Sequence, residues 1–244
     1  MKRNSEDTGY VISNTPYREY DAMILFLGEK YGLLRFVLRG YYRPTSKQMN
    51  LGLEYSKVKY RFNYRENSLL SVQNGELINV YASNREDYDW LTLMSLYSEI
   101  LTRFYSPEEH SFWLNVSEDV FKGINLKKII LILSELIIKL GITPHVSSCV
   151  MSGNTIVSDF SIEKGGFVSK EYRTQNSQVT LEMLKYIRVL FTKEKIKEKI
   201  FDGFNDTFAL SQLLIEYIEY HESITLNSWK LIVENGKVYE NESI

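Results

Sequence analysis

A strictly alternating segment at residues 57–65 constrains the fold of this chain more than any other feature. Side chains along a β-strand point to opposite faces with a period of two. One face would carry Val58, Tyr60, Phe62 and Tyr64, and the other Lys57, Lys59, Arg61, Asn63 and Arg65. The segment therefore predicts a strand with one buried aromatic face and one exposed basic face.

The rest of the first 81 residues also has the pattern of strands. Short apolar or β-rich runs occur at residues 9–13, 22–27, 33–39 and 69–81, and turn-forming residues separate them. Together with residues 57–65 they make about five short strands without a long helix. Such a set fits a small closed β-barrel.

After residue 81 the apolar period changes to that of a helix. Helical spacing of apolar residues predicts helices at residues 88–105, 126–140, 179–191 and 207–221. A polar, glycine-bearing stretch at residues 147–178 lies between the second and third of these helices. We expect a barrel domain at residues 1–81 followed by a helical domain at residues 82–244.

The charge of the chain is unevenly distributed. The net charge is −2, but residues 1–80 carry 12 Lys and Arg against 8 Asp and Glu, a balance of +4. The remaining residues carry 17 and 23, a balance of −6. A basic first third on an acidic remainder indicates that only the barrel meets a polyanion.

Two basic segments are candidates for that contact. One is the charged face of residues 57–65, whose side chains are almost all of one sign. The other is a strand and loop at residues 35–47, where cations alternate with aromatic rings, the combination that single-stranded nucleic acid uses. The alternatives are a solvated strand face and tyrosines that pack back onto the barrel. The candidate residues are Arg35, Arg39, Tyr41, Tyr42, Arg43, Lys47, Lys57, Lys59 and Arg61.

Other signals are weak or missing. The chain contains no phosphate-binding loop, dinucleotide fingerprint, nucleophile elbow or zinc-protease motif, so we expect no enzymatic activity. The single cysteine, Cys149, cannot form an internal disulfide. Residues 1–7 are polar and precede no apolar signal segment, so we expect a cytoplasmic protein without membrane contact.

Several short motifs resemble those of the RecO family of bacterial recombination mediators. They are a strand at residues 9–12 with Tyr-x-Glu-x-Asp at residues 17–21, Gly-x-x-Arg-Pro-x-Ser at residues 40–46, a Cys149 segment with Gly165-Gly166, and residues 220–228 near the C-terminus. The motifs run in the order of the family from residue 9 to about residue 230.

The resemblance implies an α+β multidomain protein: a five-stranded OB-fold barrel, then a helical domain with a zinc-finger-like β-hairpin inserted at residues 145–178. It also implies a DNA repair and recombination mediator that binds single- and double-stranded DNA and anneals complementary strands. With RecR, such a protein helps to load RecA onto strands coated with single-strand-binding protein (SSB). The implied partners are DNA, RecR and the SSB C-terminal tail, with RecA indirectly, and the implied location is the nucleoid. A generic OB-fold RNA-binding factor is the alternative.

One departure from the family concerns zinc. Many members carry four zinc-binding cysteines, whereas here Ser152, Ser169 and Tyr172 stand at three of those positions beside Cys149. A structural zinc site needs four nitrogen or sulfur ligands. We therefore expect a hairpin without metal or other cofactor, packed through Phe160, Phe167 and Tyr172.

The SSB tail is acidic and ends in an apolar residue, so it suits a hydrophobic groove with a cationic rim. The segment at residues 126–140 places cations at both ends of an apolar run. Its candidate tail-binding residues are Lys127, Lys128 and Lys139. The alternative is that these lysines simply end a core helix.

Overall fold

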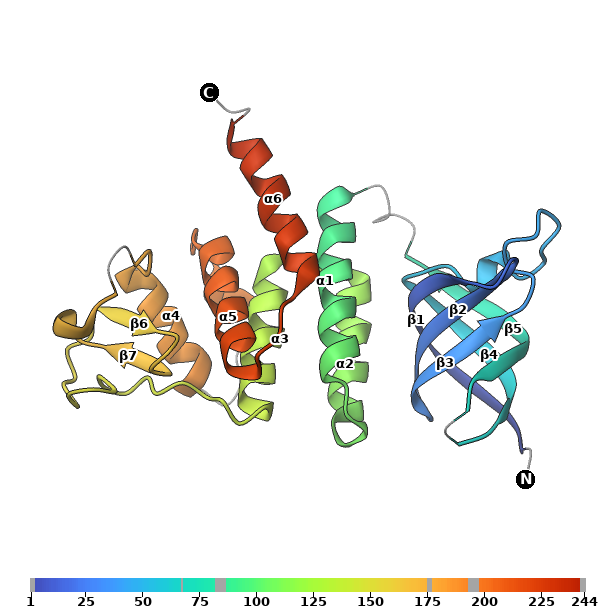
Figure 1. Ribbon diagram of the computed structural model, residues 1–244, viewed down its shortest axis with the longest axis horizontal. Coiled ribbons are helices and arrows are strands. Elements are labelled where there is room, and N and C mark those ends of the chain that lie inside the picture. Colours follow the sequence, from blue (N-terminus) through green and yellow to red (C-terminus); the bar gives the residue numbers. More distant parts are fainter. Residues whose placement is uncertain (1–2, 67, 82–86, 175–176, 193–197, 242–244) are drawn as a thin grey trace. The chain divides into compact units, whose positions relative to one another are not determined.

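A computed structural model describes residues 3–66, 68–81, 87–174, 177–192 and 198–241. The contacts divide the chain into two compact units, the first extending to Ile124 and the second comprising Asn125–Lys237. Each unit is described by itself below (Figure 1). The α+β layout expected from the sequence is confirmed, because five strands precede the helical region.

Five strands of the first unit form a closed barrel (Figure 1). They are β1 (Arg3–Tyr17), β2 (Asp21–Gly28), β3 (Gly32–Leu38), β4 (Ser56–Tyr64) and β5 (Leu70–Val80). The order around the barrel is β1-β2-β3-β5-β4, and β1 pairs with β4 to complete the ring. All pairings are antiparallel except the short one between β3 and β5. Closure leaves β1 without a free edge, because it has a partner on each side.

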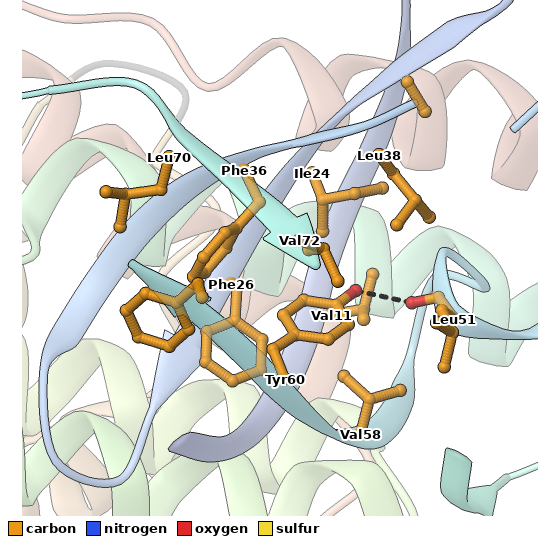
Figure 2. Packing of buried hydrophobic residues seen from close by; sticks show 12 residues of the cluster. Val11, Ile24, Phe26, Phe36, Leu38, Leu51, Val58, Tyr60, Leu70 and Val72 are labelled. Carbon is orange, nitrogen blue, oxygen red and sulfur yellow. Dashed lines mark hydrogen bonds between the residues drawn. The ribbon is translucent and has the colours of Figure 1, made fainter. Parts of the chain in front are cut away.

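Aromatic side chains fill the barrel (Figure 2). The ring of Phe36 packs edge-on against Phe26, Tyr60 and Phe62, with ring centroids 5.6, 5.2 and 4.8 Å apart. Burial of one such side chain contributes about 1.5–3 kcal/mol. The hydroxyl of Tyr60 donates a hydrogen bond to the carbonyl of Leu51, so the one buried polar atom of this ring is paired. The apolar face predicted for residues 57–65 is thus the inner wall of the barrel.

A buried carboxylate on β1 fixes the turn between β2 and β3 through hydrogen bonds. Asp7 on β1 is 1% exposed, and its side chain accepts hydrogen bonds from the backbone N–H groups of Lys30 and Tyr31 in the turn between β2 and β3. Burial raises the pKa of Asp7, although these hydrogen bonds oppose the shift. A Cβ at Gly28 would collide with the Asp7 carboxylate, so only glycine fits beside it.

Two helices of the first unit cover part of the outer wall of the barrel. They are α1 (Tyr88–Phe104) and α2 (His110–Lys122). The ring of Tyr10 on β1 lies 4.6 Å from that of Phe121 on α2, and Tyr55 meets Trp90 of α1 edge-on at 5.5 Å. The helical spacing of apolar residues predicted α1 but not α2. The boundary predicted after residue 81 adjoins residues 82–86, which lie outside the described residues, and the contacts group α1 and α2 with the barrel.

The second unit is built around the apolar helix α3 (Leu126–Lys139). It packs against α5 (Thr207–Glu222), and α4 (Leu181–Thr192) also contacts it. A hairpin of β6 (Asp159–Ser161) and β7 (Gly166–Val168) stands where a hairpin was expected, and α6 (Asn227–Asn241) follows α5. Within the described ranges, none of the helices has the length and apolar content that crossing a membrane requires.

Candidate nucleic-acid interface

The basic face of β4 points outward, as its alternation predicted, but its cations have acidic partners. Lys57 pairs with Glu29 at 2.9 Å, Lys59 with Glu6 at 2.8 Å, and Arg61 with Glu6 at 3.4 Å. The hydrogen bond from Lys59 lowers the pKa of Glu6, which keeps that carboxylate charged.

The charged side chains on this face of β4 are all cations, as predicted, but acidic residues of neighbouring segments partly neutralise them. The register explains why. Antiparallel pairing of β1 with β4 places Glu6 directly opposite Arg61, and pairing of β4 with β5 places Glu76 opposite Lys59. Opposite charges facing each other across strands stabilise a sheet by about 0.2–1 kcal/mol per pair. The outer surface of the sheet around β4 therefore carries charges of both signs, and the cations of β4 are partly neutralised.

The connection from β3 to β4 carries the second basic segment, and β2 holds its start in place. The backbone N–H of Gly40 donates to the Asp21 carboxylate at 2.8 Å, and Gly40 adopts a φ of 66° that favours glycine. Arg39 and Arg43 are exposed, and so is Lys47 further along the connection. Arg35 lies just before them on β3, exposed and opposite Leu25 of β2.

The turn between β1 and β2 contacts this connection, and no pattern in the sequence predicted that contact. The N–H of Tyr42 donates to the carbonyl of Tyr20 at 3.0 Å, and the Arg43 guanidinium lies over the Tyr20 ring, 5.4 Å from its centroid. The Tyr42 hydroxyl also donates to the Asn14 side chain at 3.2 Å. Arg18, in the same turn, has a φ of 57°, which is uncommon for a residue with a side chain. Residues 17–21 had been used only as a family motif.

We call the exposed cations and rings of these two segments the loop surface. Its members are Arg18, Tyr20, Arg39, Tyr42, Arg43 and Lys47. Tyr20 and Tyr42 expose 41% and 43% of their surface, whereas Tyr41 is half-buried and packs against the barrel core and the Tyr42 ring. None of the four cations of the loop surface forms an ion pair with another described residue. The loop surface thus combines unneutralised positive charge with exposed aromatic faces.

The lysines of α3 lie at the ends of a core helix. The apolar run between them is buried, including Ile129, Leu133 and Ile137, while Ile138 exposes 49% of its surface. Lys127 pairs with Asp202 at 3.3 Å, and the backbone N–H of Lys128 is capped by Asn125. Lys128 and Lys139 also take part in interactions within the protein. Most of the apolar run therefore packs in the core of this unit.

The region around Cys149 is held by hydrogen bonds and packing. Cys149 is 2% exposed, and its Sγ accepts the backbone N–H of Ser152 at 3.4 Å. Burial opposes ionisation, but hydrogen bonds from Ser152 and Ser169 outweigh it and lower the pKa of the thiol to about 6. No group of three or more His, Cys, Asp or Glu able to hold a metal occurs among the described residues.

The packing predicted for the hairpin is correct for two of its three residues. Phe160 and Phe167 are buried and meet edge-on with centroids 6.2 Å apart. Tyr172 exposes 44% of its surface, so its predicted packing role is wrong. Tyr172 is the last residue of a short 3₁₀ helix at Lys170–Tyr172 and lies outside β6 and β7.

Together the two units define an α+β protein in which a five-stranded barrel with an exposed cationic and aromatic surface precedes a helical region. Residues 1–81 match the family model described as "Recombination protein O N terminal". The chain is 22% identical to the DNA repair protein RecO of Oceanobacillus iheyensis, over 95% of this chain and 97% of that protein. It is 23% identical to that of Listeria monocytogenes, over 96% and 95% of the two chains. A third RecO, from Syntrophomonas wolfei, is 26% identical over 68% of this chain and 69% of its own length.

Over nearly its whole length the chain is thus similar to proteins named DNA repair protein RecO, and its first 81 residues match the N-terminal model of that family.

Proposed function

We propose that this protein acts in bacterial DNA repair and homologous recombination as a mediator that binds DNA through its barrel. Its relatives over nearly the whole chain carry the name DNA repair protein RecO, which supports this role. The five-stranded closed barrel also has the architecture of an OB fold, a fold that binds oligonucleotides. Its fold and position in the chain agree with the matched N-terminal family model.

The loop surface carries this proposal. Cations without acidic partners track the phosphates of a single strand, and exposed rings stack on its bases. Arg43 and Tyr20 already lie against each other, so a base stacked on the ring would meet a phosphate-binding cation beside it. Arg35 extends the basic surface along β3. We assign the cations of β4 a weaker contribution, because binding DNA competes with their ion pairs to Glu6 and Glu29.

The family resemblance supplies the finer parts of the proposal. They are binding of duplex DNA, annealing of complementary strands, and loading of RecA onto SSB-coated strands together with RecR. None of these steps makes or breaks a covalent bond, so the protein needs no catalytic residue. Activity in the nucleoid of the cytoplasm belongs to the same proposal.

The alternative function is binding of RNA, since stacking and phosphate contacts serve both nucleic acids. A competition titration distinguishes the two: labelled single-stranded DNA bound to the full chain is displaced with unlabelled DNA or RNA of equal length and sequence. We expect DNA to displace the label at a lower concentration. Preferential displacement by RNA would favour the alternative.

The SSB tail remains a proposed ligand of the second unit, at Lys127, Lys128 and Lys139. The tail would have to replace the ion pair of Lys127 with Asp202 and to use Ile138 as its apolar contact. Titration of a labelled tail peptide against the Lys127→Ala/Lys128→Ala variant tests this site. Unchanged affinity would place the tail elsewhere.

A further inference from the structure

The second unit contains a hollow of about 860 Å³ that the proposed DNA surface does not use. Its walls come from α5, the start of α4, the β6 end of the hairpin and the segment at residues 177–179. It lies wholly within one unit, so its shape is set by packing in that unit.

The floor of the hollow is apolar and firmly packed. It is formed by Phe160, Met183 and Leu213, which are 4%, 2% and 8% exposed. The Phe160 ring packs against the Tyr217 ring, with centroids 5.6 Å apart, and against the Phe167 ring. The hydroxyl of Tyr217 in turn donates to the carbonyl of Ile142 at 2.8 Å. This floor is preformed, which lowers the entropic cost of seating an apolar side chain on it.

The rim of the hollow is acidic. Glu163, Glu216 and Glu219 line it, and no Lys, Arg or His is among the described residues that line it. Glu163 pairs with Lys164 outside the hollow at 2.8 Å. Glu216 accepts a hydrogen bond from the neutral Gln212 amide at 2.8 Å, and Glu219 accepts the backbone N–H of Leu226 at 2.6 Å. Neither of these two carboxylates has a cationic partner in the described part of the chain.

An exposed aromatic ring completes the rim. Tyr220 exposes 55% of its surface and lies four residues after Glu216, one helical turn along α5. Residues four apart on a helix are neighbours on its surface. A cation placed between them would meet a carboxylate and the face of a tyrosine, both of which attract it.

We propose that this hollow is a docking site for a basic peptide segment of a partner protein, with an apolar side chain between its cations. The apolar side chain would sit on Phe160, Met183 and Leu213, while a flanking Arg or Lys would meet Glu216 and Tyr220. The acidic rim repels nucleic acid and acidic tails, so the site takes a different ligand from the loop surface and does not depend on the proposed function.

The test uses the full chain and a labelled short peptide that alternates arginine and leucine. Fluorescence anisotropy gives its affinity for the wild-type protein and for Glu163→Gln/Glu216→Gln. This variant removes two rim charges but keeps the hydrogen bond from the Leu226 N–H to Glu219. Exposed charge pairs contribute about 0.2–1 kcal/mol each, so we expect binding about two- to thirtyfold weaker in this variant. The matched control is Glu182→Gln, which changes an exposed carboxylate of α4 outside the hollow.

Two further peptides decide whether the hollow itself is used. Replacement of the leucines by serine should weaken binding, because the apolar floor then loses its ligand. Replacement of the arginines by glutamate should abolish it. The proposal is overturned if the serine peptide binds as well as the leucine peptide, since attraction would then be a matter of charge alone. It is also overturned if Glu163→Gln/Glu216→Gln and Glu182→Gln weaken binding equally.

Discussion

The Arg43 guanidinium lies over the Tyr20 ring, 5.4 Å from its centroid, and so joins two loops that are far apart in the sequence. The backbone hydrogen bond from Tyr42 to Tyr20 reinforces the same junction. Because both loops are fixed to β2, the cation and the ring are presented together on a rigid barrel. Preorganisation of this kind reduces the entropy lost when a flexible single strand binds.

Replacement of Tyr20 by alanine should weaken binding of single-stranded DNA. Stacking of a base on an aromatic ring is worth about 1–3 kcal/mol, so the loss should be roughly 5- to 150-fold in Kd. The measurement is a fluorescence titration with a short labelled oligonucleotide. Tyr172→Ala serves as the control, because Tyr172 is equally exposed but lies in the second unit. Equal effects of the two substitutions would count against stacking on Tyr20.

Local patterns in the sequence were sufficient for much of the barrel. The alternation at residues 57–65 predicted which side chains of β4 are buried, and Val58, Tyr60 and Phe62 are all fully buried. In the second unit, Thr180 caps the start of α4, because its Oγ1 accepts the backbone N–H of Met183 at 3.1 Å. These features depend on residues within a few positions of each other, so the chain order reveals them.

Contacts between residues that are far apart in the sequence could not be predicted from local patterns. Glu6 neutralises Lys59 and Arg61 from 53 and 55 positions away, and only the register of β1 against β4 brings them together. For the same reason the polar residues 3–8 were not predicted as strand, although they extend β1 along β4. The helix α2 was missed because its apolar residues are interrupted by polar ones such as Ser117, which is buried and hydrogen-bonded to Tyr97.

Asp7 should make the stability of the barrel depend on pH. Its pKa is raised in the folded state, chiefly by burial, so the folded protein binds a proton more readily than the unfolded chain does. Protonation therefore stabilises the fold relative to Asp7→Asn, which cannot titrate but still offers one acceptor oxygen. The gain begins as the pH falls to the raised pKa and is complete below the ordinary value of 3.8.

Urea unfolding of the wild type and Asp7→Asn between pH 7 and pH 4 measures this effect. We expect the wild type to gain free energy of unfolding relative to the variant as the pH falls. A relative loss over the same range would show that hydrogen bonds to the carboxylate outweigh its burial and that its pKa is lowered.

The hairpin region should fold without zinc. Cys149 provides one thiol, and the Ser152 and Ser169 hydroxyls that accompany it are poor zinc ligands because they stay protonated at neutral pH. Protein purified without a metal-binding tag should contain far less than one zinc per chain, and its thermal melt should be unchanged by a chelator. One zinc per chain, or a melting temperature that falls sharply with chelator, would contradict this expectation.

Because the cations of β4 are partly neutralised, removing their acidic partner should strengthen DNA binding. Replacement of Glu6 by glutamine should release Lys59 and Arg61 from their shared carboxylate. Both would then be available to phosphates, so binding of single-stranded DNA should tighten about two- to fivefold at low salt, the range expected for exposed charge pairs. Glu108→Gln, which changes an exposed carboxylate of the first unit between α1 and α2, is the control. Weaker binding by Glu6→Gln would indicate that the pairs serve to hold the DNA surface in shape.

The central claim is that DNA binds the loop surface more strongly than the face of β4. The most direct test is the dependence of single-strand binding on salt for Arg39→Ala/Arg43→Ala/Lys47→Ala and for Lys57→Ala/Lys59→Ala/Arg61→Ala. Each phosphate contact contributes about 0.7 to the slope of log K against log salt for single strands, so three contacts account for about two. We predict that the slope decreases by close to this amount in Arg39→Ala/Arg43→Ala/Lys47→Ala. In Lys57→Ala/Lys59→Ala/Arg61→Ala it should decrease clearly less. A larger loss in the β4 variant, or an unchanged slope in the loop variant, would contradict the account.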